Sequence, residues 1–452
     1  MRRTNLVISC LVACLACSAG LLTHLSGCGG GRGGGTTPLP PTPQKIQHVV
    51  IIFQENRTPD NLFHGLPGAD IAGTGINSLG QVIPLTSVPL ANDYDLSHAH
   101  SAFVAMYDGG KMDGADKIRI GCKAGATNCP PPNPQFRYVD PADVQPYFQL
   151  AQQYTFADRM FQTNQGPSFP AHQFIISGTS APTATSDLFA SENVVLPLNH
   201  GSNTAAGCAG PVGETVALID PMGSEATRQF PCFEHQTLID LLDSGGIGWR
   251  YYAPSPGSIW TGPNAIQHLR FGSDWQNVII PQTTVLTDIA GGHLPAVSWV
   301  IPSGQASDHP LSTDGSGPSW VASIVNAIGN SQYWSNTAIF ITWDDWGGWY
   351  DHVAPTIHNS YEYGFRVPLI VVSPYAKRGY VSHVTHDYGS FLKFIEANFN
   401  LPSLGYADSL ADDLSDCFDF SQTPAPFSAI AVRFDAAYFL NNKSAALDPD
   451  DD

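Results

Sequence analysis

Two polar clusters each follow an apolar run and carry side chains that could bind a metal. Glu55 and Asn56 come directly after the run QHVVIIFQ. Asp344 and Asp345 come directly after the run TAIFITW. A carboxylate behind a buried strand is costly unless it is paired or binds a metal. These oxygen donors suit one divalent cation (Ca, Mg, Mn or Zn), which would polarise a phosphoryl oxygen and stabilise an attacking alkoxide. The alternative is that they form ordinary turns.

Ser168 is the candidate nucleophile, in the stretch NQGPSFP of residues 164–170. The Gly-Pro and Phe-Pro pairs restrict the backbone, which predicts a rigid turn that presents the hydroxyl at a fixed position. A plain turn serine is the commoner reading of such a stretch. The sequence contains no G-x-S-x-G motif, which argues against an esterase of the α/β-hydrolase type.

The elements around these residues predict an α/β fold. Four apolar runs have the composition of buried strands: 47–54, 296–302, 337–343 and 367–373. Four segments have helical patterns: 144–154, 236–244, 320–329 and 388–399. This alternation predicts a three-layer α/β/α sandwich around a mostly parallel sheet. Because function collects at the carboxyl ends of parallel strands, the two polar clusters could be neighbours there.

Composition narrows the class of protein. The 452 residues include 39 acidic and 20 basic ones, for a formal charge of −19, and only 13% are charged. The hydrophobic content of 43% excludes a disordered solvating chain, and the scarcity of Lys and Arg argues against nucleic-acid binding. With 43 Gly and 36 Pro, the chain is expected to be a loop-rich secreted enzyme with an ample core.

The first residues are expected to be removed on export. Residues 1–27 have a basic start and an apolar run, as in a secretory signal peptide. They end at Leu25-Ser26-Gly27-Cys28, which resembles a bacterial lipobox and predicts lipidation of Cys28. The protein would then be a cell-envelope lipoprotein, attached to a membrane by its lipid. The alternative is an ordinary signal peptide and a secreted protein. Residues 28–45 form a Gly/Pro-rich linker.

Four cysteines are predicted to form two disulfides. Cys122 and Cys129 bracket one short loop, and Cys208 and Cys232 flank a Gly/Pro-rich insertion. An oxidising compartment would allow both pairs to form, which leaves Cys417 free. A cysteine-based zinc site is the weaker alternative, because no C-x-x-C pair follows the signal segment.

Several motifs resemble the bacterial phosphoesterase family, which holds the non-haemolytic-type phospholipases C and a group of acid phosphatases. Gln54–Arg57 with Asp60 and Phe63–Gly65 is similar to the family's opening E-N-R-[ST]-F-D-x-x-F-G. Further matches follow in order: His98 with 110–114, then 166–170, 307–310, 341–353 and 364–368 through 394–396. The resemblance covers about residues 46 to 408, and the ordered co-occurrence makes it specific.

This resemblance implies a metal-dependent reaction. Glu55, Asn56, Asp344 and Asp345 would bind the cation. Ser168 would coordinate the same cation as an alkoxide and attack phosphorus, which gives a phosphoserine that water hydrolyses. The family's fold is similar to that of the alkaline phosphatase superfamily, with loop-rich insertions, which agrees with the predicted sandwich.

Further residues gain roles from the same resemblance. His98, Asn164 and His309 would hold phosphoryl oxygens or protonate the leaving group, and His352 would lie beside them as a substrate-binding residue. His100 is a rival for the role of His98.

Two arginines and two departures from the family pattern complete the motifs. Arg57 and Arg366 could clamp phosphate, although pairing with a carboxylate is the commoner role of such residues. Trp346 stands where relatives often carry His, and Ala171-His172 replaces the usual Asn-Arg or Asn-His pair.

The sequence therefore predicts a catalytic domain over residues 46–410 and a C-terminal extension, 411–452, with an acidic disordered end. The expected activity is hydrolysis of a phosphate ester or phospholipid, of the phospholipase C or acid phosphatase type. The alternative is a non-catalytic envelope lipoprotein that uses the same fold as a binding scaffold. The sequence makes no prediction of the oligomeric state.

Overall fold

The structure is a computed structural model that describes residues 44–198 and 205–442. The predicted signal peptide, Cys28, most of the linker and the acidic end after residue 442 lie outside the described residues. The remaining predictions can be compared with the structure.

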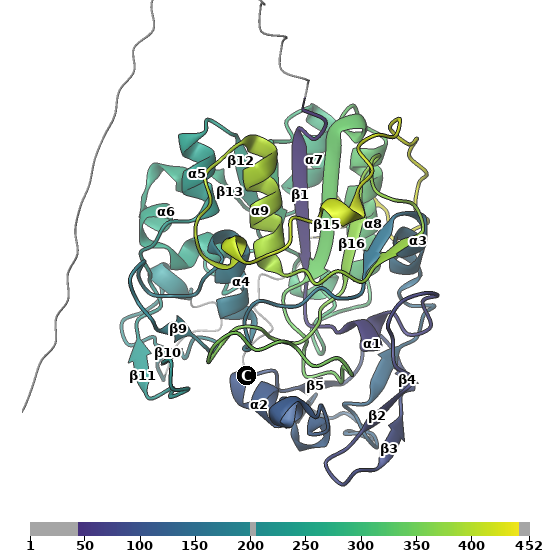
Figure 1. The fold of residues 1–452 in the computed structure, drawn as a ribbon, viewed down its shortest axis with the longest axis vertical. Helices are drawn as coiled ribbons and strands as arrows, with labels where there is room; N and C mark the ends of the chain where they lie inside the picture. The colour runs from purple at the N-terminus through teal and green to yellow at the C-terminus, as the bar shows by residue number, and fades with distance from the viewer. Residues whose placement is uncertain (1–43, 199–204, 443–452) are drawn as a thin grey trace, which may run out of the picture. The chain divides into compact units, whose positions relative to one another are not determined.

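The centre of the fold is an eight-stranded sheet in the order β13-β12-β14-β1-β15-β16-β8-β17 (Figure 1). Its strands are β1 (His48–Gln54), β8 (Thr155–Ala157), β12 (Trp249–Tyr252), β13 (Val278–Ile279), β14 (Val297–Val300), β15 (Thr337–Trp343), β16 (Leu369–Val372) and β17 (Tyr380–Ser382). Only β16 runs against its neighbours, β15 and β8, among the strands of this sheet. The predicted mostly parallel sheet is confirmed.

Helices cover both faces of the sheet. One layer consists of α3 (Gln145–Gln153), α7 (Thr284–Gly291), α8 (Gly317–Gly329) and α10 (Ala436–Asn441), which pack around α8. The other consists of α4 (Ser168–Ser177), α5 (Leu238–Ser244) and α9 (Tyr388–Phe399), which pack around α4. In Figure 1, α4 and α9 lie in front of the sheet and α7 and α8 behind it. The three-layer α/β/α sandwich is therefore confirmed.

The two central strands form because their residues suit burial on both faces. Strand β15 is buried along its whole length, and β1 is buried after His48. Their β-branched and aromatic side chains pack well in a sheet that helices cover on both sides. The sequence did not reveal β8, β12, β13 and β17, which have only two to four residues each. Runs of that length carry no readable periodicity.

Loop-rich insertions lie at the carboxyl ends of β1 and β15, in the lower part of Figure 1. The first carries α1 (Pro59–Leu62), α2 (His100–Tyr107), β2 (Thr74–Ile76), β3 (Val82–Pro84), β4 (Thr86–Val88), β5 (Tyr94–Leu96), β6 (Ile120–Cys122) and β7 (Arg137–Val139). It has a second apolar cluster, in which Leu96 and Phe103 pack with Trp346, Trp349 and Phe365. The position of Trp346 is thus apolar and filled by an indole.

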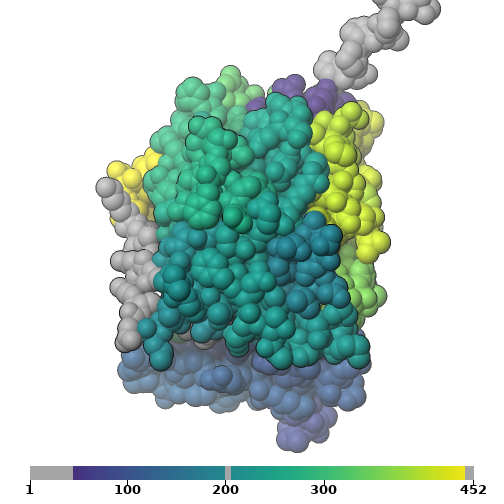
Figure 2. All heavy atoms as spheres, turned by 90° about the vertical axis from the view of Figure 1, so that its left-hand side faces the viewer, coloured from purple at the N-terminus to yellow at the C-terminus, as the bar shows by residue number. Residues whose placement is uncertain are grey.

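Another insertion, between α4 and α5 in the chain, contains a small three-stranded sheet of β9 (Phe189–Ala190), β10 (Val216–Ile219) and β11 (Thr227–Gln229). Helix α6 (Gln267–Phe271) follows α5 in the chain. Figure 2 shows the side of the molecule that α5 and α6 cover, drawn in teal to green. In the ranges that the structure describes, no helix is both long and apolar enough to cross a bilayer.

Both predicted disulfides are present. Cys122 is bonded to Cys129 and Cys208 to Cys232, while Cys417 is free and buried. Described residues beyond 410 pack against the body: the side chains that are buried there include Leu414, Cys417, Phe418, Ile430 and Phe439.

Candidate active site

The register of two parallel strands brings the acidic clusters together. Gln54 in β1 pairs with Trp343 in β15, so the next residue of each strand, Glu55 and Asp344, leaves the sheet at the same level. The Asp344 N–H donates to the Gln54 carbonyl oxygen at 2.9 Å. The Asn56 backbone N–H donates to Asp344 Oδ1 at 3.1 Å. The predicted proximity of the two strand ends is confirmed.

The two loops approach each other too closely for ordinary residues. Asn56 has a φ of 66°, in the left-handed region that asparagine tolerates better than most residues. A Cβ on Gly347, whose own φ is +64°, would lie 2.3 Å from the Asn56 carbonyl oxygen. The glycine after the Asp-Asp pair is therefore required for the loop of β15 to pack against the loop of β1.

One part of the site is a buried group of three possible metal ligands. Ligand atoms of Glu55, His172 and Asp344 all lie within 4.8 Å of one another, and the three residues are buried. His172 Nε2 is 3.4 Å from Glu55 Oε1 and 4.0 Å from Asp344 Oδ2. His172 was not among the residues predicted from the sequence to bind the metal. Its spacing of four residues from Ser168 is the signal that could have placed both on one helix face.

The other part of the site contains the candidate nucleophile. Ser168 Oγ donates to Asp345 Oδ2 at 3.2 Å. Asn56 joins the two parts: its side-chain Nδ2 donates to Asp345 Oδ2 at 3.4 Å, and its backbone N–H is bonded to Asp344. Asp345 Oδ1 accepts from the Gly347 N–H at 2.7 Å, which fixes the carboxylate in place. The structure thus brings together all five residues predicted as metal ligands.

Two predicted histidines lie beside this group. His98 Nδ1 is 3.0 Å from the Leu96 carbonyl oxygen, and its Nε2 is 3.1 Å from Asn56 Nδ2. These contacts favour the neutral ring protonated at Nδ1, because Nε2 then accepts from the amide. Its ring centroid is 5.8 Å from that of His309, whose Nδ1 is 2.6 Å from the Pro310 carbonyl oxygen.

Ser168 is the first residue of a helix rather than part of an isolated turn. It follows Pro167, the N-cap of α4, and Pro170 in the first turn of the helix costs no hydrogen bond, because the first N–H groups of a helix have no partner within it. The side chain of Asn193 caps the same end, because its Oδ1 accepts from the Phe169 N–H at 2.9 Å. The hydroxyl therefore lies at the positive end of a ten-residue helix, where a phosphate is electrostatically favoured.

Asn164 is buried in the loop that leads to Ser168. Its Nδ2 donates to the carbonyl oxygens of Gly166 at 2.8 Å and Pro167 at 3.4 Å. These bonds order the segment before α4. A contact of Asn164 with substrate stays a prediction.

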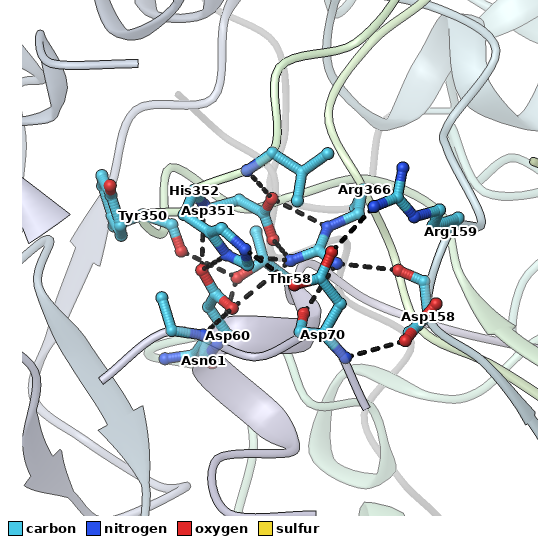
Figure 3. Close-up of polar contacts among 12 residues, drawn as sticks. Thr58, Asp60, Asn61, Asp70, Asp158, Arg159, Tyr350, Asp351, His352 and Arg366 are labelled. Atoms are coloured by element: carbon cyan, nitrogen blue, oxygen red, sulfur yellow. Dashed lines mark hydrogen bonds and ion pairs between the residues drawn. The ribbon is translucent and has the colours of Figure 1, made fainter. Parts of the chain in front are cut away.

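His352 belongs to a different polar cluster (Figure 3). Its Nδ1 lies 2.8 Å from Asp60 Oδ2 and its Nε2 lies 3.1 Å from Asp70 Oδ1. Arg366 donates from Nε and Nη2 to the two carboxylate oxygens of Asp351, each at 2.9 Å. The pairing of Arg366 with a carboxylate is therefore confirmed. The substrate-binding role of His352 stays a prediction, since the contacts described for it hold it among these carboxylates.

Arg57 supports the loop that carries His309. Its Nε and Nη2 donate to the Asp308 carbonyl oxygen at 2.9 and 2.6 Å, and its guanidinium lies 5.0 Å from the ring centroid of Trp349. The Asp308 carboxylate accepts from Tyr147 at 2.9 Å. Burial raises the pKa of Asp308 to about 6, although the charge of Arg57 opposes the shift. Arg57 thus binds a backbone carbonyl group where pairing with a carboxylate was expected.

The residues present fit a divalent cation. Asn56 Oδ1 and Asp344 Oδ2 are buried, and neither accepts a hydrogen bond from the described residues. Buried acceptors without donors are costly unless something else satisfies them. With Glu55 and His172 nearby, they make a donor set of oxygens and one imidazole nitrogen, which hard and borderline divalent cations accept.

A buried acidic site at the carboxyl ends of a mostly parallel sheet defines an α/β protein able to hold a metal ion. Residues 46–402 match the model of the Phosphoesterase family. The chain belongs to this family and is a hydrolase that acts on phosphoric ester bonds.

Several curated relatives are phospholipases C. Phospholipase C B of Mycobacterium tuberculosis is 23% identical over 485 residues, which cover 92% of this chain and 85% of the relative. The hemolytic phospholipase C of Pseudomonas aeruginosa is 25% identical and is matched over 84% of this chain and 56% of its own length. A protein in the alkaline phosphatase superfamily from Vibrio parahaemolyticus is among the similar solved structures, at 11% identity and a TM-score of 0.34, over 81% of this chain and 70% of that one.

We predict that His352 makes stability depend on pH. Burial alone would lower its pKa, but the hydrogen bond with Asp60 and the charges of Asp60 and Asp351 raise it from 6.5 to about 9. Because the folded protein favours the protonated ring, its contribution to stability is complete below pH 6.5 and is lost as the pH rises through about 9. The difference in Tm between wild type and His352→Gln should shrink across that window.

His48→Gln is the matched control. Burial lowers the pKa of His48 despite its hydrogen bond with the Pro295 carbonyl group, so its contribution should be lost as the pH falls. A difference between wild type and His352→Gln that is constant from pH 6.5 to 9 would contradict the assignment.

Proposed function

We propose that the protein is a metal-dependent phosphoesterase that acts through Ser168. The observation that carries this proposal is the hydrogen bond of 3.2 Å from Ser168 Oγ to Asp345 Oδ2, beside the buried Glu55, Asn56 and Asp344. A hydroxyl at a helix N-terminus, bonded to a carboxylate that can take its proton, has the arrangement of an activated nucleophile.

In this mechanism Ser168 Oγ attacks phosphorus and its proton passes to Asp345 Oδ2. The bond between phosphorus and the leaving oxygen breaks, which leaves a phosphoserine. Water then attacks phosphorus and the bond from phosphorus to Ser168 Oγ breaks. Ser168 Oγ takes back the proton from Asp345, and the proton of the water passes to the group that protonated the leaving oxygen. His98 Nε2 lies 4.0 Å from Asp345 Oδ2, and the His98 ring is next to that of His309. Because His98 Nε2 accepts from Asn56 in the resting site, it donates to a phosphoryl oxygen or to the leaving oxygen only after it takes up a proton.

The cation would be held by Glu55, Asn56, Asp344 and Asp345, and His172 is positioned to join them. When bound, a divalent cation there withdraws charge from a phosphoryl oxygen and lowers the pKa of a bound hydroxyl. The buried carboxylates would repel an anionic ester without such a charge.

The preferred substrate is a phospholipid or a similar phosphodiester. Relatives named phospholipase C match most of this chain, which supports this class over the monoesters that an acid phosphatase hydrolyses. The intact set of Glu55, Asn56, Ser168, Asp344 and Asp345 favours an enzyme over a non-catalytic scaffold.

We further propose that the protein is exported, since its two disulfides suit an oxidising compartment. Lipidation of Cys28 rests on the sequence alone. Cys28→Ala should move the protein from the membrane fraction to the soluble fraction of cells that make it, while Cys417→Ala should leave it attached. Membrane attachment of the Cys28→Ala protein would contradict the anchor.

Replacement of the nucleophile tests the mechanism. Ser168→Ala should lower kcat on p-nitrophenyl phosphate and p-nitrophenyl phosphorylcholine by at least about a thousandfold, because no other hydroxyl takes its place. Ser177→Ala is the matched control: it lies at the other end of α4, where its Oγ donates to the Gln173 carbonyl oxygen at 2.7 Å, and it should keep the activity. Equal rates for wild type and Ser168→Ala would contradict the mechanism.

Metal content tests the proposed ligands independently of activity. Asp344→Asn should weaken binding of Mn²⁺ or Zn²⁺ by more than about tenfold in calorimetric titration, because one of the charges that bind the cation is lost. Asp158→Asn removes an equally buried carboxylate, which accepts from the Asp70 N–H at 2.7 Å, and it should leave metal affinity unchanged. Undiminished metal binding by Asp344→Asn would refute the ligand set.

A further inference from the structure

A cavity of about 260 Å³ opens beside the candidate nucleophile. Its wall includes Ala99, Pro167, Glu192, Asn193, Val194 and Arg228. It combines an apolar surface with one acidic, one basic and one amide side chain. A small polar group is a better fit to this volume than a diacylglycerol, because drug-sized ligands already need about 300–1,000 Å³.

Two residues of the cavity wall are sequence neighbours of residues in the candidate active site. Pro167 directly precedes Ser168, and Ala99 directly follows His98. Asn193 links the cavity to α4, because its Oδ1 accepts from the Phe169 N–H at 2.9 Å. The cavity therefore borders the N-terminal end of α4, which is the end that carries Ser168.

Glu192 is the acidic group of the cavity wall. Its Oε1 accepts from the His100 N–H at 3.1 Å. Burial and then the charge of Glu225 raise its pKa to about 7, against the opposing effects of His100 and His98. The influence of His98 on Glu192 places this carboxyl group within electrostatic reach of the candidate active site.

The surroundings favour a positively charged occupant. Glu225 is outside the cavity wall but acts electrostatically on Glu192, and its Oε1 is 3.2 Å from His100 Nδ1. Arg228 is exposed on the cavity wall and acts electrostatically on Glu225. The charge of Arg228 is thus offset by Glu225, and Glu192 is the carboxyl group of the cavity wall that remains to face an occupant. The Nδ2 of Asn193 is buried and has no acceptor in the described part of the chain, so it can donate to an oxygen of the ligand.

We propose that this cavity binds the polar substituent of the phosphodiester and selects one that carries a primary ammonium group, such as ethanolamine, through Glu192. The inference rests on the proposed phosphoesterase function and adds its substrate class. A primary ammonium can donate up to three hydrogen bonds to a carboxylate. A trimethylammonium donates none and is recognised by aromatic faces, and no aromatic side chain lines this cavity among the described residues.

The test compares p-nitrophenyl diesters of phosphoethanolamine and phosphocholine. Wild type, loaded with metal, should show a kcat/KM about tenfold higher for the ethanolamine ester, the effect of one hydrogen bond to a charged group. Glu192→Gln should lower kcat/KM more for the ethanolamine ester than for the choline ester, because only the first loses a hydrogen bond, and so bring the two values close together. Glu214→Gln is the matched control, because burial also raises the pKa of Glu214 to about 7 and it bonds to the Gly207 N–H instead.

A second measurement needs no variant. O-phosphoethanolamine should inhibit wild type with a Ki about tenfold below that of phosphocholine. Hydrolysis of both esters without preference, or a preference that survives Glu192→Gln, would overturn the assignment of the cavity and leave the phosphoesterase function standing. Failure of wild type to hydrolyse any of these esters would overturn the proposed function and this inference with it.

Discussion

The site depends on the repulsion among carboxylates that the β1–β15 register forces together. Glu55, Asp344 and Asp345 are all buried at the ends of two paired strands. Like charges this close in a poorly solvated interior raise the free energy of the folded state. The surrounding contacts limit this cost: Asn56 bridges Asp344 and Asp345, the Gly347 N–H also donates to Asp345, and His172 Nε2 lies 3.4 Å from Glu55 Oε1. The repulsion that remains among the three carboxylates favours the binding of a cation between them.

Arg57 extends this arrangement to the rest of the site. It follows Asn56 in the chain and binds the carbonyl group of Asp308, the residue before His309. A short segment after β1 therefore holds both the acidic group and the histidine loop. Because Arg57 is buried against Trp349, its position is set by the second apolar cluster, and not by solvent.

The sequence predicted the strands and helices whose hydrophobic pattern extends over many consecutive residues. The strands at 47–54 and 337–343 are long apolar runs, and the helix at 388–399 has the bounds that the structure gives. Short strands such as β13 form because their neighbours pair with them, and two residues contain no pattern that shows this. The antiparallel direction of β16 likewise depends on the path of the chain between strands.

For the candidate site too, the sequence predicted what depends on neighbouring residues and missed what depends on tertiary contacts. Residues next to strand ends could be placed by adjacency, which is why Glu55 and Asp344 were found together. His172 was not, because the prolines around Ser168 predicted a turn, whereas four-residue spacing has a meaning only on a helix. His352 lies near the acidic motif in sequence, but its contacts are with Asp60 and Asp70, which no spacing rule indicates.

Helix α4 has a mechanical consequence for the site. Ser168 and His172 lie one turn apart on it, so they move as a rigid body, while Glu55 and Asp345 lie on the loops that follow β1 and β15. Their separation across the gap is set by apolar packing of the two layers, where the ring of Phe53 lies 6.2 Å from that of His172 and 6.4 Å from that of Phe391. Apolar contacts beneath the site therefore set the reaction geometry. Loss of a methylene group from these contacts would shift Ser168 relative to Asp345, although no polar side chain had changed.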